Sequence, residues 1–215
     1  MKQVKSSDDG APLTRREKAR ATRLAIIHAA QEEFVANGYH ATTMSAIAAR
    51  AGVAVQTVHF VFHTKGELLG AVVDNAVLGE EPPTPPEQTD WYRAVLEEQD
   101  PIEALRRFVL AGKGIFVRAS AMNEVARSAA GTDPDARATF ERVERLREAG
   151  YRNFLAHLAT RCSFRDDLGL DGALDVLLSL LSPRMFLSLT QDRGWDADRA
   201  MAWIADTVPG LILAR

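Results

Sequence analysis

The chain has 215 residues, of which 47% are hydrophobic and 26% are charged, a composition that excludes wholesale disorder and a fibrous repeat. Its single cysteine, Cys162, excludes an internal disulfide and a zinc site that needs two or more thiolates of one chain. No stretch resembles a secretory signal or reaches the roughly 20 apolar residues of a membrane span, so we expect a cytoplasmic protein.

The charge is divided unevenly along the chain. Residues 1–65 hold nine Lys and Arg against five Asp and Glu, whereas the whole chain has a net charge of −3. A basic segment followed by an acidic remainder predicts that one end of the molecule meets a polyanion and the other does not.

The N-terminal segment predicts a tail and then a long helix. Residues 1–13 mix charged and small residues without hydrophobic period, which is typical of a disordered tail. The sequence Thr14-Arg-Arg-Glu17 matches a capping box and predicts the start of a helix. Apolar residues then recur at helical spacing, and Asn37-Gly38 predicts where this helix ends.

Two short helices are expected next. Thr43 is a good N-cap for a helix over 44–51, and Gly52 predicts a turn. Apolar spacing resumes over 55–62. Two short helices around a glycine turn, inside a basic segment, are the helix-turn-helix arrangement.

The remainder of the chain predicts helices alone. Thr64 is the expected cap of the next helix, and the four prolines of residues 80–88 indicate a linker or, alternatively, an ordered loop over a pocket. Helical apolar spacing then covers 101–116, 133–162, 172–191 and 196–213. The charge run at 141–148 indicates an exposed helix face. No window alternates apolar and polar residues as a strand does, so the fold class is all-α.

At several positions this chain resembles the DNA-binding segment of the tetracycline-repressor (TetR/AcrR) family. The matching residues are Thr42-Thr43, Ile47-Ala48, Ala51-Gly52-Val53, Thr57-Val58, Phe62, Lys65 and Leu68. The resemblance implies an N-terminal three-helix, helix-turn-helix DNA-binding domain at 14–65 and a C-terminal helical effector-binding and dimerisation domain at 66–215. It also implies a homodimer on a palindromic double-stranded DNA operator, acting as a repressor that a small molecule releases.

The resemblance and the residue chemistry together suggest DNA contacts. Thr43 and Lys65 begin helices, where the backbone dipole favours phosphate, and Gln56 can pair with adenine while Val55 packs on a thymine methyl. The complete set of expected DNA-binding residues is Arg15, Arg16, Arg20, Thr42, Thr43, Val55, Gln56, Thr57, His59 and Lys65.

Two departures from the family pattern stand out in this segment. Ala54 takes the place of the usual serine before the recognition helix, which removes a side-chain cap worth about 1 kcal/mol. His59 takes the place of a usual tyrosine, and a protonated His59 would bind phosphate more tightly, so a mild pH dependence of DNA binding is a hypothesis.

Pocket and dimer residues follow from the family analogy and the apolar periodicity. For His157 a satisfied core or interface histidine is the favoured interpretation, and a polar pocket contact is the alternative. The expected pocket residues are Phe108, Phe116, Met122, Asn153, Phe154, His157 and Met185. The expected dimer-interface residues are Leu177, Leu181, Leu189, Met201, Ile204, Val208 and Leu211.

Neither a cofactor nor a metal is expected, and two other functions compete with the ligand-responsive repressor. The first is a DNA-binding regulator without a small ligand, controlled by a protein partner. The second is a small helical enzyme, which lacks support because the sequence holds no Gly-rich phosphate loop, HExxH pair or nucleophile elbow.

Overall fold

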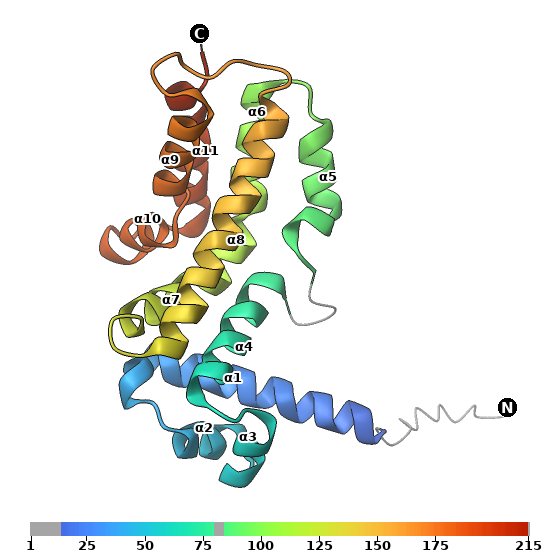
Figure 1. The fold of residues 1–215 in the computed structure, drawn as a ribbon, viewed down its shortest axis with the longest axis vertical. Coiled ribbons are helices and arrows are strands. Elements are labelled where there is room, and N and C mark those ends of the chain that lie inside the picture. The colour runs from blue at the N-terminus through green and yellow to red at the C-terminus, as the bar shows by residue number, and fades with distance from the viewer. Residues whose placement is uncertain (1–13, 80–83, 215) are drawn as a thin grey trace, which may run out of the picture.

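The computed structural model describes residues 14–79 and 84–214. In these ranges all of the secondary-structure elements are helices (Figure 1). The expected disordered tail at 1–13 lies outside the described residues. The first part of the chain forms α1 (Arg15–Ala41), α2 (Met44–Ala51), α3 (Val55–Val61) and α4 (Lys65–Leu78). The remainder forms η1 (Pro86–Gln88), α5 (Asp90–Glu97), α6 (Pro101–Ala111), α7 (Lys113–Ala129), α8 (Pro134–Leu158), α9 (Gly169–Leu180), α10 (Pro183–Leu187), η2 (Ser188–Asp192) and α11 (Ala197–Ile212). The all-α prediction is confirmed.

Helix α1 begins where its sequence predicts, and at the predicted end, Gly38, it is broken rather than finished. The Thr14 hydroxyl accepts from the Glu17 amide at 3.2 Å, and the Glu17 carboxylate accepts from the Thr14 amide at 2.7 Å. Gly38 leaves helical geometry with φ 75° and ψ 168°, a conformation that costs little only in glycine. One short turn then carries the chain to Ala41.

Three features of the body differ from the expected helices. The stretch 101–116 is two helices that meet at Gly112, and the stretch 172–191 is broken after Leu181 because Ser182 caps a new helix that starts at Pro183. Proline has no backbone N–H to continue the earlier helix. Helix α5 was not expected, although Thr89 caps it in the ordinary way by accepting from the Tyr92 amide.

The helices form a head at one end of the molecule and a longer body (Figure 1). Helices α1–α3 make the head, and α8 rises from it along the body toward the end where α5, α6, α9 and α11 lie. The residues buried in the head also include Leu68, Leu69 and Val72 of α4 and Met122 of α7. The head therefore shares one hydrophobic core with α4, α7 and the start of α8.

Residues Gly169–Asp192 include the only stretch of the described residues that is long and apolar enough, on its own, to resemble a membrane span. It is not one continuous helix, because Leu181 has φ −89° and ψ 63° and separates α9 from α10. The buried part of α9 packs against α8 and α11. Only 28% of the apolar window is buried, so packing within the chain explains its composition only in part.

Two glycines of α4 face α8 at different distances. A Cβ added to Gly66 would overlap the Cβ of Asp135, whereas one added to Gly70 would meet only the Thr139 hydroxyl at 3.5 Å. The close approach of α4 to the start of α8 therefore depends on Gly66.

Gly66→Ala is expected to lower the free energy of unfolding by about 1–3 kcal/mol, because it forces α4 away from α8. The matched control Gly70→Ala is expected to leave stability unchanged or raise it by up to about 1 kcal/mol, since alanine favours helix. Urea unfolding followed by circular dichroism measures both. Equal stabilities of the two variants would contradict the tight contact at Gly66.

Candidate DNA-binding surface and ligand cavity

Helices α2 and α3 form the expected helix-turn-helix. Their axes differ by 105°, within the range of this motif. The turn depends on Gly52, whose φ is 68° and whose amide donates to the carbonyls of Ala48 and Ala49. Ala54 provides no side-chain cap for α3, as predicted. Its carbonyl instead accepts from the Thr57 amide at 2.9 Å.

Helix α3 has one buried and one exposed face. Val58 and Phe62 lie in the head core, one helical turn apart. Gln56 and His59 are exposed, and Phe60 exposes 85% of its surface. Phe60 was missed by the sequence analysis, although it lies four residues after Gln56 and so shares its face. An aromatic ring that is exposed beside a side-chain amide can pack on a thymine methyl while the amide bonds to a neighbouring base edge.

Val55 and Thr57 are partly buried at the start of α3, and Thr43 is exposed at the start of α2. The Thr43 hydroxyl accepts from the Ala46 amide at 3.1 Å. This arrangement presents the first turn of α2 to solvent, where backbone amides and the helix dipole favour a phosphate. The contacts of these residues with DNA stay predictions.

The prediction of a DNA contact for Thr42 is wrong. Its side chain is 1% exposed. Its hydroxyl donates to the carbonyls of Glu33 and Gly38 at 3.0 and 2.8 Å. These bonds hold the chain where it leaves α1, so Thr42 supports the motif from inside and does not reach its surface.

The side chain of Lys65 is also turned inward, contrary to the expected phosphate contact. Its ammonium donates to the carbonyls of Tyr39 and Thr42 at 2.8 and 3.1 Å and lies 4.3 Å from the centre of the Tyr39 ring. Burial lowers the pKa of Lys65. The residue ties the first turn of α4 to the end of α1, and the exposed residues at this helix start are Thr64 and Glu67.

The basic residues at the start of α1 lie on the surface. Arg15, Arg16 and Arg20 are exposed on the half of α1 that extends away from the rest of the head (Figure 1). Arg23, one turn further on, lies 4.4 Å above the ring of Phe62 and so packs on the head itself. Their position suits backbone contacts on DNA, which stay predictions.

A set of polar contacts joins the head to the body beside the helix-turn-helix. The Tyr39 hydroxyl donates to Asp133 Oδ2 at 3.0 Å, and Asp133 Oδ1 accepts from the Ala136 amide as the N-cap of α8. His40 Nε2 and the Thr132 hydroxyl lie 2.8 Å apart. The pKa of Asp133 is lowered, chiefly by the Ala136 amide and with a contribution from Tyr39. The end of α1 is thus fixed to the start of α8.

Tyr39→Phe is expected to lower the free energy of unfolding at pH 7 by about 1 kcal/mol, because Asp133 loses one hydrogen bond to its charged form. Because the pKa of Asp133 is lower in the folded protein, its charged form stabilises the fold at pH values above the ordinary pKa of 3.8. This contribution is lost as the pH falls through the lowered pKa. The difference between variant and wild type should therefore shrink below pH 3.8. Urea unfolding across this pH range measures it, and a difference that grows with acidity would contradict the bond.

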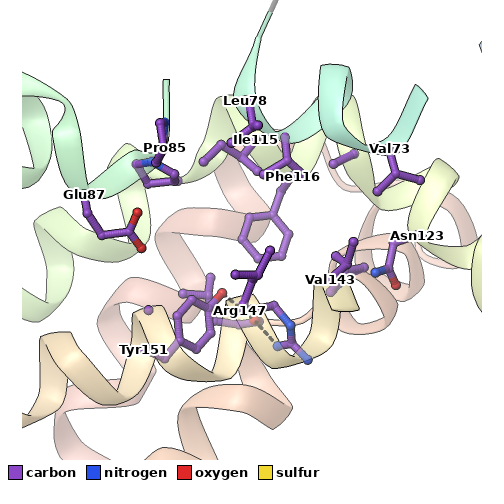
Figure 2. A pocket seen from close by; sticks show the side chains of 18 of the residues that line it. Val73, Leu78, Pro85, Glu87, Ile115, Phe116, Asn123, Val143, Arg147 and Tyr151 are labelled. Carbon is purple, nitrogen blue, oxygen red and sulfur yellow. Dashed lines mark hydrogen bonds between the residues drawn. The ribbon is translucent and has the colours of Figure 1, made fainter. Parts of the chain in front are cut away.

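The body contains a cavity of about 350 Å³, the size of a small-molecule site (Figure 2). Its walls come from α4, α5, α6, α7 and α8, with η1 on one side. Most of the lining is apolar, and the aromatic members are Trp91, Tyr92, Phe108, Phe116 and Tyr151.

The two arginines of the cavity wall are each paired with a carboxylate. Arg142 donates to Asp74 at 2.7 Å, and Arg147 donates to Glu144 at 2.5 Å. A second amino group of Arg147 donates to the carbonyls of Leu178 and Leu181 at 3.1 and 3.3 Å. Arg147 is only 18% exposed, so the charge run at 141–148 is not entirely the exposed face that its sequence indicated. Figure 2 shows Arg147 beside Tyr151 in the cavity wall.

Two of the expected pocket residues, Phe108 and Phe116, line the cavity. The others do not. Phe154 is stacked behind Phe108 at 4.0 Å, and Met122 lies in the shared core of the head. Asn153 is exposed, and His157 forms a hydrogen bond with the Leu96 carbonyl at 3.0 Å. Met185 packs against the core of the body. The helical period of apolar residues predicts which side chains are buried. It does not predict which of the buried side chains border a cavity.

Most of the expected dimer residues are covered within the chain itself. The buried ones are Leu177, Leu181, Met201, Ile204 and Val208, and Leu181 lines the cavity. They are core residues because α11 packs against α6 and α9 and α9 packs against α8. Leu189 is partly buried, whereas Leu211 is 38% exposed and Trp203 is similarly exposed on the same helix.

Comparisons with known proteins agree with this architecture. Residues 26–72 match the family described as bacterial regulatory proteins, tetR family. No curated protein matches the chain. The structure of NalD, the secondary repressor of the MexAB-OprM multidrug efflux pump in Pseudomonas aeruginosa, superposes with a TM-score of 0.67 at 21% identity over 92% of this chain and 98% of that one.

Two further solved structures are similar. The TetR-family transcriptional regulator PfmR from Thermus thermophilus has a TM-score of 0.66 at 21% identity over 86% of this chain and 97% of that one. The SmeT–triclosan complex has a TM-score of 0.71 at 20% identity over 90% and 92%. At these identities the likeness establishes the fold.

Proposed function

Because this chain is a TetR-family transcriptional regulator by its DNA-binding segment and its all-α fold, we propose that it is a repressor that binds a palindromic operator as a homodimer and is released by a small molecule. Regulators of this family are non-enzymatic DNA-binding proteins, so the chain is not an enzyme. Its expected place of action is the cytoplasm, where the DNA lies.

The observation that carries the proposal is the position of α4. Its first turn is tied to the end of α1 through Lys65, and its middle lies in the core of the head. Its last turns contribute Val73, Val77 and Leu78 to the cavity wall. A molecule that fills the cavity therefore presses on the same helix that fixes the helix-turn-helix.

Such coupling requires a difference in affinity between two states. A ligand that binds the released arrangement of α4 a few kcal/mol more tightly than the DNA-bound one shifts the population toward release. The cavity favours this interpretation over a regulator controlled by a protein partner alone. SmeT, which has the same fold, is described in complex with triclosan.

The exposed face of α3 supplies the groups that would read DNA. Gln56 can accept and donate at one adenine, and Phe60 can pack on a thymine methyl. Thr43, at the open first turn of α2, would hold a phosphate that sets the register of α3. In a two-fold dimer two such helices meet half-sites about one DNA turn apart, or a multiple of it.

Gln56→Ala is expected to weaken binding to the operator by about 1–3 kcal/mol, or roughly 5- to 150-fold, while binding to random DNA changes little. The matched control Gln99→Ala changes an exposed glutamine beside α5, in the body, and should bind as the wild type does. Fluorescence anisotropy at fixed salt, first with the DNA that flanks the protein's own gene, measures each affinity.

A wild-type protein that binds no DNA better than random DNA, even after genome-wide selection of sites, would overturn the proposed function. An equal loss for Gln56→Ala on operator and random DNA would instead leave DNA binding in place and remove Gln56 from base recognition.

The proposed dimer would use the exposed side of α9 and α11. Trp203 and Leu211 are the large apolar side chains that α11 exposes, and a two-fold interface would place each against the same helix of the partner.

Leu211→Glu is expected to convert the dimer to a monomer at micromolar concentration, because it puts an unpaired charge into an apolar interface. Val35→Glu is the control, since Val35 is exposed on α1 in the head at the other end of the molecule. Size-exclusion chromatography with light scattering gives the mass of each. A dimeric Leu211→Glu protein would place the interface elsewhere.

A further inference from the structure

Two polar atoms of the cavity wall are buried without a partner. The Ser120 hydroxyl and the Arg147 Nε make no hydrogen bond within the described part of the chain, although both residues line the cavity. Ser120 is 1% exposed. Buried polar groups in folded proteins are nearly always paired, because an unpaired group loses its hydrogen bonds to water without replacement. Two such atoms in one apolar cavity point to a ligand group that pairs with them.

The chemistry of the two atoms defines that group. Arg147 Nε carries an N–H, which can only donate, and a serine hydroxyl can donate as well. The other amino groups of Arg147 are engaged with Glu144 and with the carbonyls of Leu178 and Leu181, so its Nε–H is held in place. The matching ligand group is therefore an acceptor.

The charge of the cavity decides between a neutral and an anionic acceptor. The two arginines in the wall are each neutralised by a carboxylate, Arg147 by Glu144 and Arg142 by Asp74. The remaining acid of the lining, Glu87, is exposed on η1 and adds negative charge at that side (Figure 2). A carboxylate in this cavity would lose its water without meeting a net positive charge, which is costly. A neutral oxygen avoids this cost.

The rest of the lining defines the body of the molecule. Trp91, Tyr92, Phe116 and Tyr151 present aromatic surface, and about 350 Å³ accommodates a molecule of two or three fused rings. Flat aromatic walls favour ring systems that stack on them or meet them edge-on.

We propose that the cavity binds an uncharged, ring-containing and mainly apolar molecule with a carbonyl oxygen that accepts a hydrogen bond from Arg147 Nε or the Ser120 hydroxyl. This inference rests on the proposed function, because it assigns a chemical class to the effector of the same cavity.

Three probes that share a naphthalene ring system test the proposed ligand class. The first, 2-acetylnaphthalene, carries a neutral carbonyl. The second, 2-isopropylnaphthalene, replaces the carbonyl with a hydrocarbon group of similar shape, and the third, 2-naphthoate, carries a negative charge. Isothermal titration calorimetry on the full chain measures each dissociation constant, and the fluorescence of Trp91, compared with a Trp91→Phe variant, reports occupancy of this cavity. The ketone is expected to bind at least about tenfold more tightly than either of the other two, which corresponds to one paired donor at 1.4 kcal/mol or more.

Ser120→Ala should reduce the affinity for the ketone by about 5- to 10-fold and leave that for the hydrocarbon unchanged. It should not reduce stability, because it removes a hydroxyl that has no partner. The matched control Ser179→Ala changes an exposed serine of α9 and should bind all probes as the wild type does. Arg147→Lys, which keeps a positive charge beside Glu144 but has no Nε–H, should likewise lose the preference for the ketone.

Equal affinities for the ketone and the hydrocarbon would overturn the proposal, since the two donors would then hold water alone. A preference for 2-naphthoate would overturn the neutral class, and failure of all three probes to bind the folded protein would overturn the proposal as a whole. Release of operator DNA is measured separately with the same probes. A ketone that binds without releasing DNA supports the assigned chemistry and counts against the proposed repression. A different molecule that releases DNA while no probe binds leaves the repression standing and removes the ligand class.

Discussion

Helix α4 connects the core of the head with the cavity of the body, and the arrangement of these two parts depends on it. Leu68, Leu69 and Val72 are fully buried in the core of the head, while Val77 and Leu78, two turns further on, line the cavity in the body. Close-packed interiors transmit displacement because they have little free volume to absorb it. Gly66 brings the first turn of α4 close against Asp135, and under the proposed function a ligand in the cavity would act on the far end of this helix.

The helix-turn-helix is supported by residues that look like surface contacts in the sequence. Thr42 and Lys65 are polar, and both lie at helix ends inside a basic segment, which is why they resemble phosphate ligands. The structure uses their polar atoms to satisfy backbone carbonyls of Glu33, Gly38 and Tyr39 at the end of α1. These carbonyls lie near the break and the end of α1, where the regular helical hydrogen bonding is interrupted and side chains can supply donors. Rigid support of the motif and contact with DNA are therefore divided between adjacent residues, Thr42 inside and Thr43 outside.

Local signals predicted the fold well, and spatial arrangement limited the prediction of the sites. The capping box at Thr14, the break at Gly38 and the turn at Gly52 depend on residues close in sequence, so the sequence alone reveals them. The cavity depends on which of five helices fail to fill the space between them, and no periodicity contains that information. Phe108 of α6 and Phe154 of α8 lie in one core and stack on each other, yet only Phe108 borders the space. The sequence analysis placed Arg147 on an exposed face because it belongs to a run of charges at helical spacing.

Arg147 also shows why the cavity is selective in polarity. An arginine buried in an apolar wall is tolerable only when its charge is compensated and its donors are engaged. Glu144 supplies the compensation, and two backbone carbonyls engage one amino group. These contacts cancel the attraction that a lone guanidinium would have for anions, and they leave the Nε–H of Arg147 without a partner among the described residues. The same pairing that permits the burial of Arg147 therefore converts it from a site for charge into a site for a neutral oxygen, and α8 places this oxygen site opposite the end of α4.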